Sequence, residues 1–198
     1  MHRITIKPIR PEDLDSVVSI HAASWHGTYR GMLRDTFLDQ ELLADRRSLW
    51  ASRLFPLHEA SFGFIAMVGG RAAGFCFAFV AADPRWGTLL DNLHVLPEYK
   101  GQGLGTALLL AFATEARLRH PDDTVSLWVF DQNRPARDFY ERWGARSIER
   151  AVGDAPGGGQ VAQWRYVWQS PAQLLALLNG SAGLDDCADD FTPLPGGV

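Results

Sequence analysis

A short glycine-rich loop, Lys100-Gly101-Gln102-Gly103-Leu104-Gly105-Thr106, carries the clearest chemical signal in the sequence. The loop follows a stretch with strand character and precedes one with helical periodicity. A helix N-terminus exposes unpaired backbone N–H groups and the positive end of the helix dipole, and glycines let an anion approach the backbone closely. The loop could therefore hold a diphosphate.

Two common nucleotide-binding patterns do not fit this loop. A Walker A loop needs GxxxxGK[ST], which the sequence lacks. A dinucleotide fingerprint needs GxGxxG, but the sixth position is Thr106 when counted from Gly101 and Leu108 when counted from Gly103. On the loop alone, a tight strand-to-helix turn without a ligand is as good an interpretation as a phosphate site.

A second pattern lies downstream. Residues 127–145, LWVFDQNRPARDFYERWGA, contain the arrangement N-x-x-A-x-x-F-Y-E-x-x-G. Together with residues 92–110, NLHVLPEYKGQGLGTALLL, this segment resembles motifs A and B of the GNAT N-acetyltransferase superfamily, in that family's order and separation. The resemblance extends over about residues 4–168 and is to the small bacterial-type, single-domain members. Lys100 stands where the family pattern has Gln or Arg, which keeps the positive charge but loses the planar fork of Arg.

The resemblance implies acetyl-CoA as cosubstrate, bound where the central sheet splays beside the motif A strand. The backbone of Leu93 and Val95 should pair with the pantetheine arm, and the amides from Gly101 to Thr106 should hold the pyrophosphate. Asn133 should contact the pantetheine, although on its position alone it is an equally good helix N-cap. The implied cofactor-binding residues are Leu93, His94, Val95, Lys100, Gly101, Gln102, Gly103, Leu104, Gly105, Thr106, Asn133, Ala136 and Tyr140.

By the same resemblance, Tyr140 is the expected catalytic acid. Acetyl transfer releases a thiolate whose pKa should lie near ~8.5, so a phenol that donates a proton to the sulfur helps at neutral pH. The backbone N–H of Val95 is a candidate donor to the developing oxyanion. Without the family pattern, Tyr140 would be read as a packed aromatic residue on a short helix.

A base must also accept a proton from the acceptor ammonium, directly or through water. The candidates are Asp91, His94, His21 and His26. Strand alternation places Asp91 on the face of Leu93 and Val95, and His94 on the other face, so Asp91 is the expected catalytic base. His21 lies on the apolar face of a predicted helix and is more typical of a core histidine.

The acceptor pocket is expected between the first two helices and the last hairpin, with Trp25 and Tyr29 as substrate-binding residues. Further candidate walls are Phe37, Trp86 and Trp164. Trp164 alternates with Tyr166 and Trp168, which favours core packing for these three. The expected acceptor is the primary amine of a small molecule, acetylated in a direct ternary complex. The alternatives are a protein N-terminus or lysine as acceptor, and a noncatalytic acyl-CoA-binding module.

The elements that must position these residues form a mixed α/β domain of the α+β type, with a mostly antiparallel sheet flanked by helices. Its second half should contain a strand-helix-strand crossover that is locally parallel. Residues 1–169 should form the acetyltransferase domain and residues 170–198 a C-terminal extension, with a short helix and a tail rich in Gly, Asp and Pro. The predicted strands are 4–9, 61–68, 72–82, 88–96, 124–130, 145–151 and 161–168, and the predicted helices start at Pro11, Asp35, Gly103, Asn133 and Ser170.

The composition is that of a globular chain. It has 198 residues, 46% apolar content and a net charge of −4, with no basic field that would attract nucleic acid or anionic lipid. The two cysteines, Cys76 and Cys187, have no metal-ligand spacing, so no metal is expected. No signal peptide or membrane span is evident, which favours a cytoplasmic location. The family resemblance also allows a homodimer.

Overall fold

One mixed sheet of seven strands organises the chain, in the order β1-β2-β3-β4-β5-β7-β6. The computed structural model describes residues 3–180. Neighbouring strands pair antiparallel except β4 and β5, which are parallel. This confirms the predicted α+β class and the parallel crossover. The strands are β1 (Ile4–Pro8), β2 (Ser61–Val68), β3 (Arg71–Asp83), β4 (Gly87–Val95), β5 (Val125–Phe130), β6 (Arg146–Asp154) and β7 (Gln160–Trp168).

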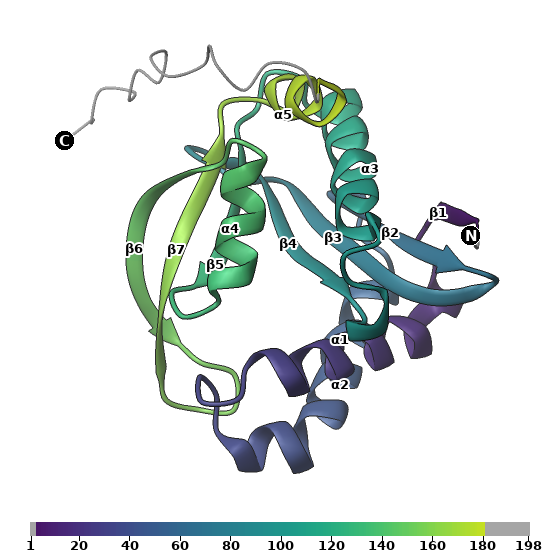
Figure 1. The fold of residues 1–198 in the computed structure, drawn as a ribbon, viewed down its shortest axis with the longest axis vertical. Helices are drawn as coiled ribbons and strands as arrows, with labels where there is room; N and C mark the ends of the chain where they lie inside the picture. The colour runs from purple at the N-terminus through teal and green to yellow at the C-terminus, as the bar shows by residue number, and fades with distance from the viewer. Residues whose placement is uncertain (1–2, 181–198) are drawn as a thin grey trace.

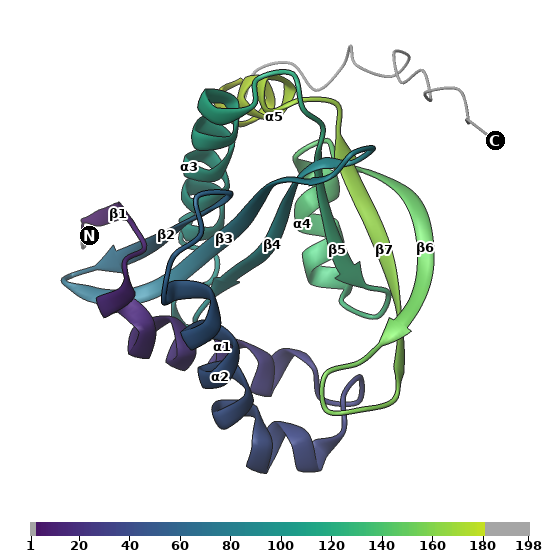
Figure 2. The same cartoon turned by 180° about the vertical axis from the view of Figure 1, so that it is seen from behind.

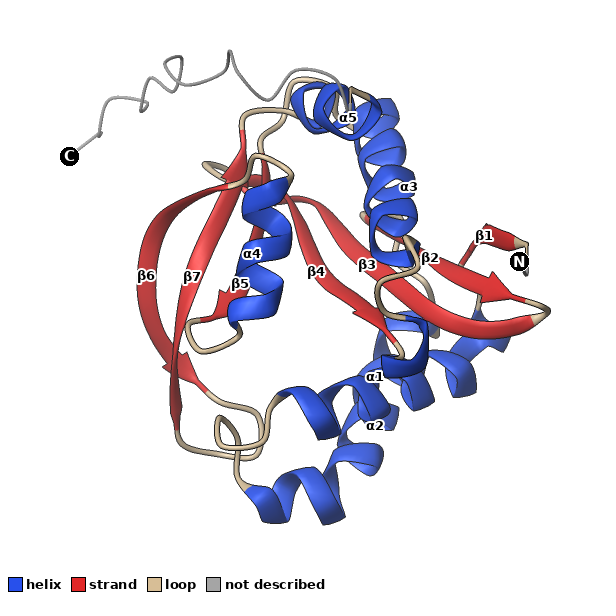
Figure 3. Ribbon diagram, in the orientation of Figure 1, coloured by secondary structure: helices blue, strands red, loops and turns tan. Residues whose placement is uncertain are grey.

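Helices cover both faces of the sheet, so the domain has three layers. Helices α3, α4 and α5 lie on one face, and α1 and α2 lie on the other (Figures 1 and 2). Figure 3 distinguishes the helices from the strands by colour. Within residues 3–180, no helix combines the length and apolar content needed to cross a membrane. The helices are α1 (Leu14–Thr28), α2 (Leu42–Leu54), α3 (Leu104–Arg119), α4 (Arg134–Arg142) and α5 (Pro171–Asn179), with 3-10 turns at Pro11–Asp13 and Pro97–Tyr99 and a π-helix at Phe37–Glu41.

Strand β3 is apolar on both faces because both faces are covered. Phe75 and Phe77 belong to the core formed with α1 and α2, whereas Cys76 and Ala78 belong to the core under α3. A strand buried on both sides reads as a continuous apolar run rather than an alternating one. Cys76 is the core residue that the sequence predicted, and burial raises the pKa of its thiol to about 12.

Strands β4 and β5 pair only at their beginnings. The pairing consists of Thr88 with Val125 and Leu89 with Ser126. Beyond Leu89 the two strands diverge, and a wedge-shaped separation opens between them (Figure 1). The splay expected from the family resemblance is therefore present, and the second half of β4 has an unpaired edge.

A β-bulge at Asp91 lies where the two strands part. The register between β3 and β4 moves from Phe77↔Asn92 to Ala78↔Leu90, so Asp91 has no partner on β3. An extra residue of this kind bends its strand and breaks the alternation of side chains. Asp91 consequently turns toward α2, where its Oδ2 accepts a hydrogen bond from Arg53 Nη1 at 2.6 Å. The prediction that Asp91 shares a face with Leu93 and Val95 is wrong for this reason.

Helix α5 packs on the domain that precedes it. The Oγ of Ser170 accepts a hydrogen bond from the backbone N–H of Gln173 at 3.1 Å, which caps the helix as expected from the Ser-Pro start. Leu174 is fully buried in the larger core, and α5 contacts α3. The remainder of the predicted extension, residues 181–198 with Cys187, lies outside the described residues.

The burial of α3 gives a matched pair of variants. Leu108 is fully buried, whereas Leu118 on the same helix is 75% exposed. We expect Leu108→Ala to lower the free energy of unfolding by about 2–5 kcal/mol because it leaves a cavity under the helix. Leu118→Ala should change it by less than about 0.5 kcal/mol. Urea denaturation of both variants measures this, and equal losses would contradict the packing described for α3.

Candidate active site

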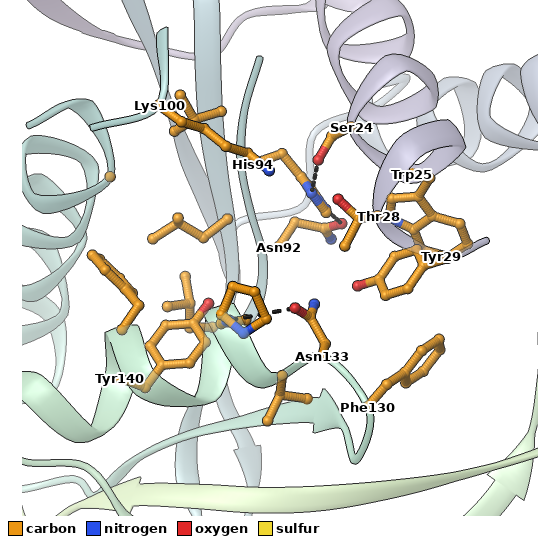
Figure 4. Close-up of a pocket in the computed structure, with 18 of the residues that line it drawn as sticks. Ser24, Trp25, Thr28, Tyr29, Asn92, His94, Lys100, Phe130, Asn133 and Tyr140 are labelled. Carbon is orange, nitrogen blue, oxygen red and sulfur yellow. Dashed lines mark hydrogen bonds between the residues drawn. The ribbon is translucent and has the colours of Figure 1, made fainter. Parts of the chain in front are cut away.

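A cavity of about 1440 Å³ lies in the opening between β4 and β5. Its lining comes from α1, α2, β4, the glycine loop, β5, α4, the end of β6 and β7. Most small-molecule pockets measure roughly 300–1,000 Å³, so this cavity has room for a long cosubstrate together with an acceptor. In Figure 4, residues of α1 line one side, and Asn133 and Tyr140 of the α4 segment lie opposite them.

The glycine loop forms one end of the cavity. Gly101 and Gly103 adopt left-handed φ angles of 74° and 82°, and no atom lies within 4 Å of the position that a Cβ would occupy on either residue. Gly103 caps α3, and the first helical hydrogen bond runs from Ala107 N–H to Gly103 C=O. The N–H groups of the first turn therefore have no helical partner and can bind an anion.

Most of the loop residues lie where the sequence placed them. Lys100, Gly101, Gly103, Leu104, Gly105 and Thr106 all line the cavity. Gln102 does not, because its side-chain amide donates to the Glu98 carbonyl at 2.9 Å. Gln102 is thus the one member of the predicted cofactor set that lies outside the cavity lining.

The unpaired edge of β4 forms the next section. Leu96 N–H donates to Ala73 C=O of the β3 side at 2.9 Å. Because donors alternate along a strand, the backbone N–H groups of Leu93 and Val95 face the opposite side, toward the opening. Leu93, His94 and Val95 all line the cavity. A ligand arm that runs along this edge can pair with the strand as a peptide would.

Asn133 caps α4, as its position in the sequence allowed. Its Oδ1 accepts a hydrogen bond from Ala136 N–H at 3.3 Å, and both residues line the cavity. The hydroxyl of Tyr29 faces the Asn133 amide across the cavity (Figure 4). Burial raises the pKa of Tyr29, an effect that its hydrogen bond with Asn133 partly offsets.

Tyr140 lies on the inner side of α4 and is 8% exposed. Its ring packs edge-on against Trp168 at a centroid distance of 6.1 Å and against Phe139 at 5.3 Å. It also lines the cavity, so the packing and functional interpretations hold together. Burial raises the pKa of Tyr140 above its ordinary value, which keeps the phenol protonated at neutral pH.

A chain of polar side chains runs along the α1 side of β4. Asn92 Nδ2 donates to Asp91 Oδ2, and Asn92 Oδ1 lies 3.3 Å from His94 Nε2. Since a carbonyl oxygen only accepts, the His94 proton resides on Nε2. His94 Nδ1 then accepts from Ser24 Oγ at 3.2 Å, the contact drawn in Figure 4. One carboxylate thereby orients three side chains.

His94 is held neutral. Burial, with repulsion from Arg46 and Lys100, lowers its pKa from 6.5 to about 3. His21 stacks on it at a centroid distance of 4.5 Å, and its Nδ1 accepts from Trp50 Nε1 at 2.8 Å. His21 does not line the cavity, which confirms its interpretation as a core histidine.

The remaining base candidates differ in their surroundings. Asp91 lines the cavity, and its carboxylate is engaged by Arg53 and Asn92. His26 is exposed beside Arg30 and Asp39 and does not reach the cavity.

Trp25 and Tyr29 line the end of the cavity away from the glycine loop, together with Phe130. The other proposed walls do not reach it: Phe37 is buried beside α2, Trp86 packs against arginines, and Trp164 bonds Asp131. Tyr166 and Trp168 are core residues, as favoured.

The sequence interpretation missed Ser24, Asn92, Arg46 and Phe130 as lining residues. Of these, Arg46 could have been found from the sequence, because it is the one charged residue in the otherwise apolar stripe Leu42, Arg46, Trp50 and Leu54 of α2.

Gly157 and Phe37 join two segments that are distant in the sequence, and neither residue lines the cavity. The β6–β7 turn packs its Gly157 against Phe37, and a Cβ at Gly157 would lie 2.2 Å from the Phe37 ring. Arg34 Nε donates to the Gly157 carbonyl. Trp25, Leu33 and Ala155 complete this small core.

The Acetyltransferase (GNAT) family profile matches residues 21–145. The chain belongs to this family. It is an acetyl-CoA-dependent N-acetyltransferase, and the match spans the glycine loop, the β4 edge and Tyr140. An uncharacterized N-acetyltransferase, YuaI, of Bacillus subtilis is 27% identical over 89% of this acetyltransferase and 99% of its own length. A mycothiol acetyltransferase of Acidimicrobium ferrooxidans is 33% identical over 85% of this chain, which spans only 47% of that protein.

Solved structures agree with the fold of this acetyltransferase. A GCN5-related N-acetyltransferase from Rhodopseudomonas palustris superposes with a TM-score of 0.66 at 22% identity, covering 85% of this chain and 97% of its own. A PaiA N-acetyltransferase from Thermoplasma acidophilum, solved in complex with coenzyme A, gives 0.60 at 20% identity over 81% and 98%.

The buried neutral His94 predicts acid sensitivity. Below pH 6.5 the unfolded chain binds a proton at this histidine, whereas the folded chain does not until about pH 3, so stability falls as the pH drops through this window. Between about pH 7 and 5, we expect the free energy of unfolding to fall by about 1–2 kcal/mol less in His94→Gln than in wild type. Ser24→Ala keeps the imidazole and should retain the wild-type loss. Urea unfolding at the two pH values measures both, and an unchanged loss in His94→Gln would contradict the neutral state.

Proposed function

We propose that this acetyltransferase transfers the acetyl group of acetyl-CoA directly to the primary amine of a small molecule. The observation that carries this choice is the aromatic lining at the end of the cavity away from the glycine loop. Aromatic walls from Trp25, Tyr29 and Phe130 suit a small organic molecule. Relatives are named for mycothiol, for thialysine and for alanine of a ribosomal protein, so family membership alone leaves the acceptor open.

The residues of the cavity fit coenzyme A. The unpartnered amides at the start of α3 and the charge of Lys100 would hold the pyrophosphate. The free backbone edge at Leu93 and Val95 would pair with the pantetheine amides, with Asn133 and Ala136 opposite. Acetyl-CoA supplies an acyl thioester, which is the activated group in the reaction.

Two groups of the chain would support departure of the thiol. The Tyr140 phenol keeps its proton at neutral pH and would donate it to the sulfur. The Val95 N–H points into the opening and would donate to the carbonyl oxygen as its charge develops.

The acceptor proton would leave on the α1 side of β4. Ser24 gives its own proton to His94, so its oxygen has lone pairs left to accept an amine N–H. Behind it, the polar chain ends on the Asp91 carboxylate, which supplies negative charge at the far end. We keep Asp91 as the proposed base, acting directly or through water, while the chain of hydrogen bonds orients Ser24.

Release of free thiol from acetyl-CoA is the direct test of this function. The panel should contain small amines, amino acids, polyamines and peptides, each with the same protein preparation. Acetylation of free amines but not of peptides supports the proposal. Activity on peptides alone would indicate a protein acceptor, and tight coenzyme A binding without turnover on any amine would indicate a noncatalytic module.

Tyr140→Phe tests the acid. We expect kcat to fall by roughly 10²–10⁴-fold, because the thiolate then leaves without a proton donor, while acetyl-CoA binding changes little. Tyr166→Phe is the matched control, since its hydroxyl bonds Arg137 and Glu141 outside the cavity. Steady-state kinetics and calorimetric binding give both values. Unchanged turnover in Tyr140→Phe would remove this residue from the mechanism.

A further inference from the structure

Arg46 is a charged residue on an otherwise apolar surface. The buried residues of α2 are Leu42, Arg46, Trp50 and Leu54, which recur every four positions and face inward. Leu42 and Trp50 belong to two apolar cores, and Arg46 lies between them with only 8% exposure. A guanidinium is expensive to bury unless other groups compensate its charge. Its position therefore needs an explanation beyond packing.

The guanidinium is only partly satisfied. Its Cζ lies 4.5 Å from the centroid of the Trp25 ring, and its Nε and Nη2 both donate to a single oxygen of Asp45. Asp45 is 41% exposed, so water weakens that pair. Nη1 has no hydrogen-bond partner among the described residues and is not sealed off by protein atoms, and Arg46 lines the cavity.

Two of the carboxylates that line the cavity are already paired with arginines, whereas Asp154 at the end of β6 also lines the cavity and has no ion pair among the described residues. Asp91 pairs with Arg53 at 2.6 Å, and on α4 Asp138 pairs with Arg134 at 2.8 Å. The charge of Arg46 is felt by both buried histidines, because it contributes to lowering the pKa of His94 and of His21. This positive charge repels the ammonium group of an acceptor, and a carboxylate on the same acceptor would offset that repulsion.

We propose that the acceptor is a primary amine that also carries a carboxylate, and that Arg46 binds this carboxylate. This inference rests on the small-molecule function proposed above and names its substrate class. Arg46 lies over the ring of Trp25, the amine-accepting oxygen belongs to the adjacent Ser24, and all three residues line the same cavity. The guanidinium orients the carboxylate, the apolar side chain lies against Tyr29 and Phe130, and the amine faces Ser24.

The test compares amino acids with the corresponding amino-acid amides, which differ only in the carboxylate. The amine of the amide is less basic, so a larger fraction of it is unprotonated and nucleophilic at neutral pH. Without recognition of the carboxylate, the amide should therefore react faster, and a preference for the acid would have to come from the enzyme. We expect wild type to acetylate the acid with the higher kcat/KM. Arg46→Gln should lower kcat/KM for the acid by roughly 10–100-fold and leave the amide within about threefold, as expected for loss of one charge-assisted contact.

Two further variants separate recognition from folding. Arg47→Gln, at the next position, removes an exposed arginine paired with Asp15 and should behave as wild type. Arg46→Lys keeps the charge without the fork and should lose less than Arg46→Gln for the acid. Acetyl-CoA binding and urea unfolding of each variant report whether the site is intact.

The outcomes distinguish the two proposals. If free amines are acetylated but wild type treats acid and amide alike, the Arg46 assignment is wrong and the small-molecule function stands. If Arg46→Gln lowers kcat/KM equally for the acid and the amide, Arg46 does not bind the carboxylate and only positions Trp25. That result would also overturn the assignment. If thiol is released from acetyl-CoA only when a peptide is the acceptor, the small-molecule function itself fails, and the inference fails with it.

Discussion

The two-residue pairing of β4 with β5 is the constraint on which the rest of the site depends. Thr88 and Leu89 hold the strands together, and the bulge at Asp91 then bends β4 away. A fully paired β4 would have used the N–H groups of Leu93 and Val95 in the sheet. Because the strands part, that edge remains available, and the cavity extends from the glycine loop to α1.

The same bulge organises the side of β4 on which we propose that the acceptor binds. By turning Asp91 toward α2, it places a carboxylate next to Asn92, whose amide then has only one satisfactory orientation. That orientation fixes the His94 proton on Nε2 and directs the Ser24 proton to Nδ1. A single backbone irregularity thus determines hydrogen-bond directions as far away as α1. Alternation alone predicted the opposite face for Asp91, since a bulge leaves no local signature in this sequence.

Other features were predictable because they depend on local chemistry. The glycines of the α3 cap, the Asn133 cap and the strand-helix-strand order are determined within a few residues. The contact of Gly157 with Phe37 joins segments 120 positions apart in sequence, and no local pattern indicated it. Arg46 belongs between these cases. Its position in an apolar stripe of α2 could be recognised from the sequence. Its contact with Trp25 could not, because that contact depends on how α1 packs against α2.

The two halves of the cavity differ in how strongly sequence determines them. The proposed donor contacts are mostly backbone N–H groups, which any residue except proline supplies once the loop and the strand edge have the correct shape. The motif that produces this shape is therefore recognisable at low identity. The proposed acceptor contacts are side chains of α1 and α2, where one substitution changes charge or volume without affecting the fold. A family can thus keep its cosubstrate while its acceptors diverge, and the acceptor must be inferred from residues such as Arg46 rather than from the shared motif.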